Sequence, residues 1–475
     1  MSTPKDLVDT PSKRICPASF MNLGSSKPQA NENVPALRRW QAIWKALETQ
    51  LVDSPRSDPH ETQFDPVQAA IVTTHIQRAK RHLPPPDLGE IDLDWPQLVF
   101  PIDVEELKVF FQFTQQRVDG RLEMYKLKTV QIDEGTEFAT SEEEIAVAVA
   151  DPRYPDSMEA YEIRATDGEM IRLEMSLREA QGILAELEND YRQMANSDPY
   201  EIVPGSHCSM CKVADRCDTF PRLDRRTEDI VPFKKRLPSA FQLLISKSRL
   251  WELDYCERRA AWRSLYSIPA DLDHLSQGAS PSMAVGNRFH RRMAKALLSD
   301  DPGSFFAGDP EMEGLYLRHL GLPCTADLDI RQTEFPVGFS VRFGTGQHSV
   351  SVVLYGLADA VGRESDNTPV IIDHKTGSKG GTSPHETEIY ALGALLRIPS
   401  APQVATHVHQ LAAGRDPVCE RLVWKRDQVG ELASRLGSLA ETAARWDPLD
   451  ATSPPFRVGE WCGTCPFEQR CLSFR

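Results

Sequence analysis

The sequence lacks a long hydrophobic run. No apolar stretch approaches the roughly 20 residues that a membrane-spanning helix needs. Residues 1–17 are polar and lack the apolar core of a signal peptide. We therefore expect no membrane association and a cytoplasmic location. The sequence also lacks a helicase or nucleotide-binding motif, so any ATP-driven unwinding would have to come from a partner protein such as a helicase.

An excess of positive charge is absent as well. The chain of 475 residues has 54 Lys and Arg against 69 Asp and Glu, which gives a formal net charge of −15. This balance argues against a protein that coats nucleic acid without specificity, because such binding rests on Lys and Arg contacts to phosphates. It is compatible with an enzyme that holds one strand in a local basic groove. The length predicts two or three domains.

The cysteines form two matching sets. The spacing C-x2-C-x5-C occurs twice, and one further cysteine lies far upstream of each triplet. The sets are Cys16, Cys208, Cys211 and Cys217, and then Cys256, Cys462, Cys465 and Cys471. Disulfides are rare in cytosolic proteins, whereas four thiolates suit a zinc ion or a cubane iron–sulfur cluster. Because zinc sites usually pair two C-x2-C knuckles, the pattern favours two [4Fe-4S] clusters, with zinc as the alternative.

The two cysteine sets divide the chain into halves with corresponding segments. The pairs are predicted helices at 140–155 and 382–399, hairpins at 161–175 and 407–424, and amphipathic helices at 177–191 and 427–446. We interpret this order as a tandem duplication with domains at 1–224 and 239–475. The charged segment 225–238 would join them. Its basic residues could contact a phosphate backbone, or the segment could be a solvated linker.

The strongest short motif is VIIDHKTG at residues 370–377. Its β-branched residues predict a buried strand that places Asp373 and Lys375 on one face of a sheet. Residues 354–361 form a second predicted strand with Asp359, and the turn between the strands predicts a hairpin. Two carboxylates that converge in this way repel each other unless a cation lies between them. Their oxygen atoms favour Mg2+ or Mn2+.

A predicted helix at 284–298 adds a histidine to this pattern. His290 could supply a nitrogen ligand to the same metal, although a lone helical histidine is more often structural. Three neighbouring arginines could contact phosphates: Arg288, Arg291 and Arg292. The helix after the hairpin carries Glu386 and Tyr390 at i, i+4 spacing, so the two share a face.

The predicted chemistry is metal-assisted hydrolysis of a phosphodiester. A bound divalent ion lowers the pKa of a coordinated water and shields the charge of the phosphate. Lys375 would orient that water or help to deprotonate it. Tyr390 could contact the substrate or the strand that carries Lys375.

Taken in order, these motifs resemble the RecB-like branch of the PD-(D/E)XK nuclease superfamily over residues 238–475. Residues 245–266 look like the opening S-x-S-x-L…C-P-R-R-F helix of that family, with Cys256 at the cluster position and Glu257 in place of the proline. GNRFH, GLADAV and IIDHKTG match its next three motifs. The metal ligands that this resemblance implies are His290, Asp359, Asp373 and the backbone carbonyl of His374.

The resemblance also implies a fold and an activity. The final cysteine triplet is similar to that of cluster-bearing members such as the AddB-type subunit and the CRISPR-adaptation exonuclease family. The implied fold is α/β, with two tandem restriction-endonuclease-like domains, each a mixed β-sheet flanked by helices and stapled by a four-cysteine cluster. The implied activity is an exonuclease that acts on single-stranded DNA or DNA ends in repair, recombination or defence. Glu386 departs from the glutamine that is usual in the family.

The first half keeps the cysteines but loses the catalytic residues. Its counterpart strand at 124–130 has Lys128 for Lys375, while no clear counterpart of Asp359 is found. The substitutions are Lys126 for Asp373, Trp40 for His290 and Ala146 for Tyr390. A cation at the position of a carboxylate cannot hold a divalent metal, so we expect an inactive domain. The alternative for this half is an unrelated zinc-binding domain.

Two functions for the whole chain follow from these patterns. The first is a metal-dependent deoxyribonuclease. The second is a non-cleaving scaffold that binds DNA or a helicase through two cysteine-bound clusters. The complete charged site favours the nuclease, because converging acidic side chains cost stability without a metal and a scaffold has no need of them.

Overall fold

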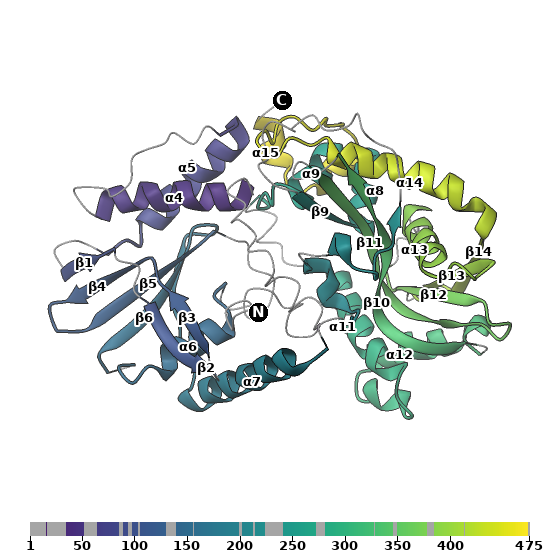
Figure 1. Cartoon of the computed structure of the whole chain (residues 1–475), viewed down its shortest axis with the longest axis horizontal. Coiled ribbons are helices and arrows are strands. Elements are labelled where there is room, and N and C mark those ends of the chain that lie inside the picture. Colours follow the sequence, from purple (N-terminus) through teal and green to yellow (C-terminus); the bar gives the residue numbers. More distant parts are fainter. Residues whose placement is uncertain are drawn as a thin grey trace.

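The chain folds into two main β-sheets that lie side by side, each flanked by helices (Figure 1). A computed structural model describes Cys16 and the ranges 35–51, 64–84, 89–93, 97–102, 105–129, 139–154, 156–198, 202–211, 214–223, 241–271, 281–326, 328–344, 349–377, 384–412 and 414–473. In Figure 1 the colours of the first half begin in purple and blue, and those of the second half run from teal through green to yellow. This arrangement confirms the predicted α/β architecture of mixed sheets flanked by helices.

The first sheet has five strands in the order β1-β4-β5-β6-β7. They are β1 (Gly89–Asp92), β4 (Phe113–Arg117), β5 (Leu122–Lys128), β6 (Met158–Arg164) and β7 (Glu169–Arg172). Only β5 and β6 run parallel, and the other neighbours are antiparallel. A separate hairpin consists of β2 (Gln97–Ile102) and β3 (Glu105–Phe110).

Helices cover both faces of this sheet because successive strand residues alternate between the faces. Met124 packs on one side with α6 (Glu142–Ala150) and α7 (Leu177–Asn196). Tyr125 packs on the other side with α4 (Pro35–Leu51) and α5 (Pro66–Lys80). Both faces are therefore buried.

The second sheet has the order β14-β13-β12-β11-β10-β8, and β9 also pairs with β11. The strands are β8 (Arg222–Leu223), β9 (Phe241–Ser246), β10 (Asp329–Phe343), β11 (Val350–Arg363), β12 (Pro369–Lys375), β13 (Gln403–Gln410) and β14 (Val418–Lys425). β12 and β13 run parallel, whereas β10, β11 and β12 are antiparallel in turn, as are β13 and β14.

The two sheets share one pattern of strand directions. From β10 to β14 and from β1 to β7, successive pairs are antiparallel, antiparallel, parallel and antiparallel. In each sheet one helix links the parallel strands: α6 in the first and α13 (Pro384–Arg397) in the second. A second helix follows the last strand: α7 in the first and α14 (Val429–Ala444) in the second. The helices and hairpins predicted for both halves are therefore present.

The remaining helices surround the second sheet. They are α8 (Lys247–Tyr255), α9 (Glu257–Ser264), α11 (Pro281–Ala296), α12 (Pro310–Leu320) and the short α15 (Glu468–Ser473). Residues of α8, α9, α13 and α14 share one hydrophobic core with β9, β10 and β11. Residues of α11 and α12 form a separate core. Among the described residues, no helix has the length and apolar character that crossing a membrane requires.

The predicted opening helix at 245–266 is wrong in its extent. Residues 241–246 form β9, and the helical part is broken at Cys256, whose backbone is extended (φ −155°, ψ 96°). Two short helices, α8 and α9, therefore replace one long helix. The extended residue lets the chain change direction at the cysteine.

The two halves interlock. β8 pairs with β10, so residues 222–223 of the first half extend the second sheet. In return, Val67 and Ile71 of α5 join the core of the second half. The predicted linker at 225–238 lies outside the described residues, and the boundary at residue 224 stays a prediction.

Two cysteines outside both sets form a disulfide. Cys324 follows α12 in a short 3-10 helix, η5 (Pro323–Thr325), and Cys419 lies in β14; their Cα atoms are 6.8 Å apart. The expectation that this chain would contain no disulfide is therefore wrong for this pair. No sequence motif predicts this pair, because residues 95 positions apart are brought together only by the fold.

Candidate active site

The predicted catalytic carboxylates lie where β11 changes its partner strand. On one edge, β11 pairs with β9 over residues 350–355 and with β12 over residues 360–363. The two ladders leave residues 356–359 between them. Asp359 is the last of these four residues, and Asp373 directly follows Ile372, the last residue of β12 that pairs with β11. The fold thus opens a gap in the sheet at the predicted site.

Asp359 connects the sheet to α11. Its Oδ1 lies 2.7 Å from His290 Nδ1, and its Oδ2 accepts a hydrogen bond from the backbone N–H of His374. Burial alone would raise the pKa of Asp359, but the hydrogen bonds and charges of the two histidines hold it well below the usual range. Asp359 is therefore ionised at neutral pH, as a metal ligand must be.

The side chains of His290, Asp359 and His374 offer ligand atoms within 4.8 Å of one another, a group that could hold a metal ion. Burial would lower the pKa of His290, but the adjacent carboxylate raises it overall. The sequence predicted the backbone carbonyl of His374 as a ligand. In the structure its buried imidazole also faces the site, with Nδ1 3.4 Å from Asp359 Oδ2.

Asp373 lies between two ammonium groups. Lys247 donates a hydrogen bond to Oδ1, and Lys375 Nζ lies 2.8 Å from Oδ2. Lys375 also donates to Glu386 Oε2 at 2.7 Å. Burial alone would raise the pKa of Asp373, but the two lysines lower it. Asp373 and Lys375 therefore share one face of the sheet, as expected. The second lysine, Lys247, was not expected.

Lys247 is the residue that sequence reasoning missed. It begins α8 directly after β9, whose parallel pairing with β11 fixes its position beside the gap. Burial would lower its pKa, but the charges of Asp373, Glu386 and Asp359 raise it. The ammonium therefore stays charged at neutral pH. The sequence signal that could have pointed to Lys247 is its position between Ser246 and Ser248 in the segment 245–266.

Tyr390 contacts the site from its buried side. Its hydroxyl donates to the carbonyl oxygen of Leu357 at 2.7 Å and accepts from Lys247 Nζ at 2.8 Å. The side chain is 1% exposed, so it contacts the catalytic strands and is closed to substrate. Gly356 makes room for it, since a Cβ there would lie 2.6 Å from the tyrosine ring.

The three arginines near His290 are partly engaged. Arg288 pairs with Glu311 at 2.7 Å and Arg292 with Asp309 at 3.1 Å, while Arg291 is exposed. A phosphate would have to replace a carboxylate at two of these three positions.

The helix that carries Tyr390 is also tied to α8. His385 Nε2 lies 2.9 Å from Asp254 Oδ2, and its Nδ1 lies 3.1 Å from Glu388 Oε2. The hydrogen bond with Glu388 raises the pKa of His385, with burial opposing and Asp254 adding to the rise. The imidazole of His385 thus links α13 to α8 on one flank of the site.

The segment that contains these residues matches the model of a known family. Residues 244–472 match the model of the PD-(D/E)XK nuclease superfamily. The match covers just under half of the chain and includes every second-half residue described above.

Other comparisons add little to the superfamily match. No curated protein matches the chain. A solved structure described as the crystal structure of SSO0001 is 17% identical to it, covering 49% of this chain and 87% of that chain. Its TM-score of 0.26 is too low to support an argument about the fold.

Within the matched residues 244–472, hereafter the superfamily segment, the second cysteine set gathers around one pocket. The pocket is lined by Cys256, Cys462, Cys465 and Cys471, with Arg259 and Trp461 among its neighbours. Among the described residues, the groups compact enough to hold a single metal ion do not include this set. Thiolates around one zinc ion lie within about 4 Å of each other, and these four side chains are not arranged so compactly.

The first cysteine set lies outside the superfamily segment but against its sheet. Cys208 and Cys211 pack with Val353 of β11. Burial raises the pKa of Cys208 to about 12, and the nearby thiols of Cys211, Cys217 and Cys16 add to the rise. The thiols of Cys16, Cys211 and Cys217 therefore all lie near that of Cys208.

The matching positions of the first sheet hold no carboxylate. By the register of the strands, Gln112 and Lys126 stand where the superfamily segment has Asp359 and Asp373. Lys126 is buried and forms an ion pair with Glu144 at 2.7 Å. A cation thus occupies the position of the carboxylate, as the sequence predicted. Gln112 is the counterpart of Asp359 that sequence reasoning did not find.

The backbone between these positions is held in the same way in both sheets. The N–H of Leu127 donates to Gln112 Oε1, just as the N–H of His374 donates to Asp359 Oδ2. Trp40, which the sequence placed in the position of the histidine ligand, donates from Nε1 to the carbonyl oxygen of Leu127 at 3.3 Å. Neutral hydrogen bonds at Leu127 therefore replace the charged contacts that Asp359 makes in the second sheet.

Proposed function

We propose that the chain is a divalent-metal-dependent nuclease that hydrolyses phosphodiester bonds of DNA, acting on single strands or ends. The observation that carries this proposal is the convergence of His290, Asp359, Asp373 and Lys375 at the gap beside β11. The superfamily match over the same segment supports the same reaction class.

Mg2+ or Mn2+ fits this donor set. The ligands would be His290, Asp359 and Asp373, together with the carbonyl oxygen or the imidazole of His374. Both carboxylates have lowered pKa values and are ionised, and hard oxygen donors suit these ions. A bound divalent ion supplies an activated water and shields the negative charge of the phosphate.

The side chains themselves position the reacting groups. Lys375 is held between Asp373 and Glu386 and is 29% exposed, so its ammonium reaches the open side of the site. There it can orient the attacking water and stabilise the negative charge that develops on the phosphate. Tyr390 keeps Lys247 and the backbone of β11 in place from the buried side.

We also propose a [4Fe-4S] cluster on Cys256, Cys462, Cys465 and Cys471. All four cysteines line one pocket, and their spacing is wider than a single ion needs. Such a cluster would tie the break between α8 and α9 to the end of the chain. The same chemistry is proposed for the first set, in which three thiols lie near that of Cys208.

We infer that the first half is an inactive copy of the second. The shared strand directions support this view, as do the matching hydrogen bonds of Gln112 and Asp359. Each cysteine triplet also begins in a 3-10 turn after an extended glycine, with Gly205 before η2 (Ser206–Met210) and Gly459 before η8 (Glu460–Thr464). With Lys126 in place of the carboxylate, this half would contribute to binding and not to cleavage.

The test is cleavage of end-labelled single-stranded DNA by anaerobically purified full-length protein with Mn2+. Lys375→Ala should lose nearly all activity while its iron and sulfide content stays unchanged. Lys80→Ala, on the exposed side of α5, serves as the matched lysine control and should cleave normally. Duplex DNA and RNA of the same sequence establish the preferred substrate.

Either of two results would overturn the proposal. Full activity in Lys375→Ala would exclude the assigned site. No cleavage of any nucleic acid by wild-type protein with its cluster intact would favour the non-cleaving scaffold. A protein that cleaves but contains zinc in place of iron would retain the nuclease and refute the cluster.

A further inference from the structure

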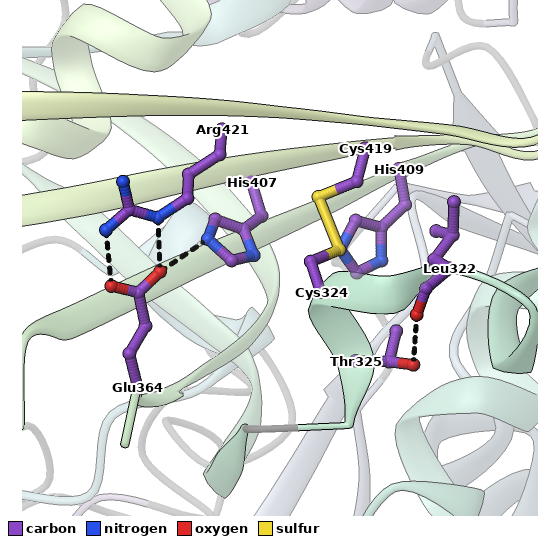
Figure 2. The surroundings of a disulfide bond; sticks show 8 residues. All are labelled: Leu322, Cys324, Thr325, Glu364, His407, His409, Cys419 and Arg421. Carbon is purple, nitrogen blue, oxygen red and sulfur yellow. Dashed lines mark hydrogen bonds and ion pairs between the residues drawn. A yellow bond between two sulfur atoms is a disulfide. The ribbon is translucent and has the colours of Figure 1, made fainter. Parts of the chain in front are cut away.

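A second group of metal-binding side chains lies away from the proposed active site. Cys324, His407, His409 and Cys419 gather on the outer strands of the second sheet (Figure 2). One ligand atom from each of the four lies within 4.8 Å of the others. Neither the nuclease chemistry nor the eight clustered cysteines account for these residues.

Three different segments bring the group together. His407 and His409 are two apart on β13, so both point to the same face. Cys419 is the direct partner of His409 across the β13–β14 ladder. Cys324 arrives from η5, which follows α12. The convergence therefore depends on the tertiary fold and has no short sequence motif.

The fold does not require polar residues at these positions. In the register of the first sheet, the counterparts of His407, His409 and Cys419 are Tyr161, Ile163 and Met170. The same strand arrangement is therefore compatible with aromatic and aliphatic side chains. Burying two histidines and a cysteine at these positions costs free energy unless their polar atoms bind a ligand.

The carboxylate of Glu364 orients the ring of His407. Its Nε2 lies 2.8 Å from Glu364 Oε1, and Glu364 is itself held by two hydrogen bonds from Arg421, each 2.7 Å long. The other ring nitrogen, Nδ1, is buried, has no hydrogen-bond partner among the described residues, and points toward the disulfide (Figure 2). A carboxylate on one nitrogen and an open second nitrogen is the usual arrangement of a metal-binding histidine.

His409 is also prepared to bind a metal. It is fully buried, and its Nε2 already lies 3.4 Å from Cys324 Sγ. Burial lowers its pKa to about 2, so the ring is neutral at physiological pH. Burial also lowers the pKa of His407, more than Glu364 raises it. Metal ions bind neutral imidazole, so neither ring would have to lose a proton.

We propose that Cys324, His407, His409 and Cys419 bind a zinc ion when the two cysteines are reduced. Two thiolates and two imidazoles are a complete tetrahedral set for zinc, with no position left for water. In such a site a sulfur and a nitrogen ligand are about 3.5 Å apart, close to the 3.4 Å separation of Cys324 and His409. The site is therefore structural and not catalytic.

The disulfide and the zinc site are alternative states of the same sulfur atoms. Zinc release with disulfide formation removes two electrons from the two thiolates. A small-molecule disulfide can accept them and, with two protons, leaves as two thiols. In a reducing compartment the dithiolate state is favoured, because disulfides there are not maintained.

Zinc at this position would fasten η5 to the two outer strands. β13 pairs with β12, which carries the proposed catalytic residues, and the ring of His409 lies 5.3 Å from that of His374. Loss of zinc should therefore loosen the sheet next to the active site. This inference does not rest on the nuclease proposal, since it concerns metal content.

The first test is the metal content of full-length protein purified under reducing, anaerobic conditions. We expect about one zinc ion per chain, the number that one such site holds, and its loss in Cys324→Ser and His407→Ala with iron unchanged. His319→Gln is the matched control, because this buried histidine lies 5.3 Å from His409 but outside the four-residue group. It should retain the zinc. Zinc content that is equal in wild type and both ligand variants would overturn the proposal.

The second test needs no substitution. Wild-type protein is reduced, loaded with zinc or treated with a chelator, alkylated with iodoacetamide, and analysed peptide by peptide. Zinc should protect Cys324 and Cys419 at least tenfold relative to the chelated protein. Equal alkylation of both cysteines in the two samples would refute zinc binding. Because the readout is specific to two peptides, the other eight cysteines do not affect it.

Discussion

Replacing Lys247 by methionine should destabilise the metal-free protein and strengthen metal binding. The ammonium of Lys247 lies between Asp373, Glu386 and the hydroxyl of Tyr390, and it is charged. It therefore neutralises a buried carboxylate that the proposal assigns to the metal. Two cations that share one carboxylate repel each other, so Lys247 should stabilise the empty site and oppose metal binding.

The expected magnitude follows from burial. Removing one partner of a buried ion pair costs about 3–5 kcal/mol. Because Lys375 still contacts the other oxygen of Asp373 at 2.8 Å, we expect the lower end, about 3 kcal/mol. For a domain of this size each kcal/mol shifts the melting temperature by about 2–4 °C, so metal-free Lys247→Met should melt about 6–12 °C below wild type.

The assay is thermal unfolding with and without Mn2+, together with a titration of Mn2+ binding. Mn2+ should recover most of the lost stability in Lys247→Met and should bind at least tenfold more tightly than to wild type, a relief of about 1.4 kcal/mol in repulsion. Lys375→Met is the matched control, since its ammonium contacts the same carboxylate but is more exposed; its metal-free loss should be smaller. An equal loss of stability with and without Mn2+ in Lys247→Met would refute the reasoning.

Three further substitutions and one control test the surroundings of the site and the first half. Gly356→Ala should push a Cβ against the ring of Tyr390 and lower cleavage at least tenfold. The control Gly314→Ala has open space around its Cβ inside α12, so it should leave cleavage unchanged and raise stability by about 0.5–1 kcal/mol. Lys126→Met should break a buried ion pair and cost about 3 kcal/mol in urea unfolding without a change in specific cleavage activity; reduced activity would contradict an inactive first half. Because the folded pKa of His385 is raised, its stabilisation should be full below pH about 6.5 and lost as the pH rises through that pKa. The advantage of wild type over His385→Gln, up to about 1 kcal/mol, should shrink over that range, and a pH-independent difference would contradict the assigned pair.

The first half helps to distinguish what the fold needs from what a reaction needs. Both sheets hold the backbone at the end of the central hairpin with a side-chain acceptor, Gln112 in one and Asp359 in the other. The hydrogen bond is therefore a property of the fold. The negative charge is not, because an amide accepts the same bond. Its presence in the second sheet alone supports a charged ligand such as a metal ion there.

Local features of this protein were determined by the sequence itself. The alternation that places Asp373 and Lys375 on one face is a property of any strand, and the i, i+4 spacing of Glu386 and Tyr390 is a property of any helix. The repeated cysteine spacing also marked the two halves. Such patterns involve neighbours in the chain, so they can be recognised before any packing is known.

Only the tertiary structure decided which distant residues meet. Lys247 reaches Asp373 because β9 and β12 pair with successive parts of β11, and Cys324 reaches Cys419 because η5 lies against β14. The register of the strands likewise identified Gln112 as the counterpart of an acid. These contacts depend on strand register and on the burial of whole faces, which sum over many weak interactions along the chain. No short motif encodes them, and for that reason the lysine of the site and the proposed zinc ligands emerged only from the fold.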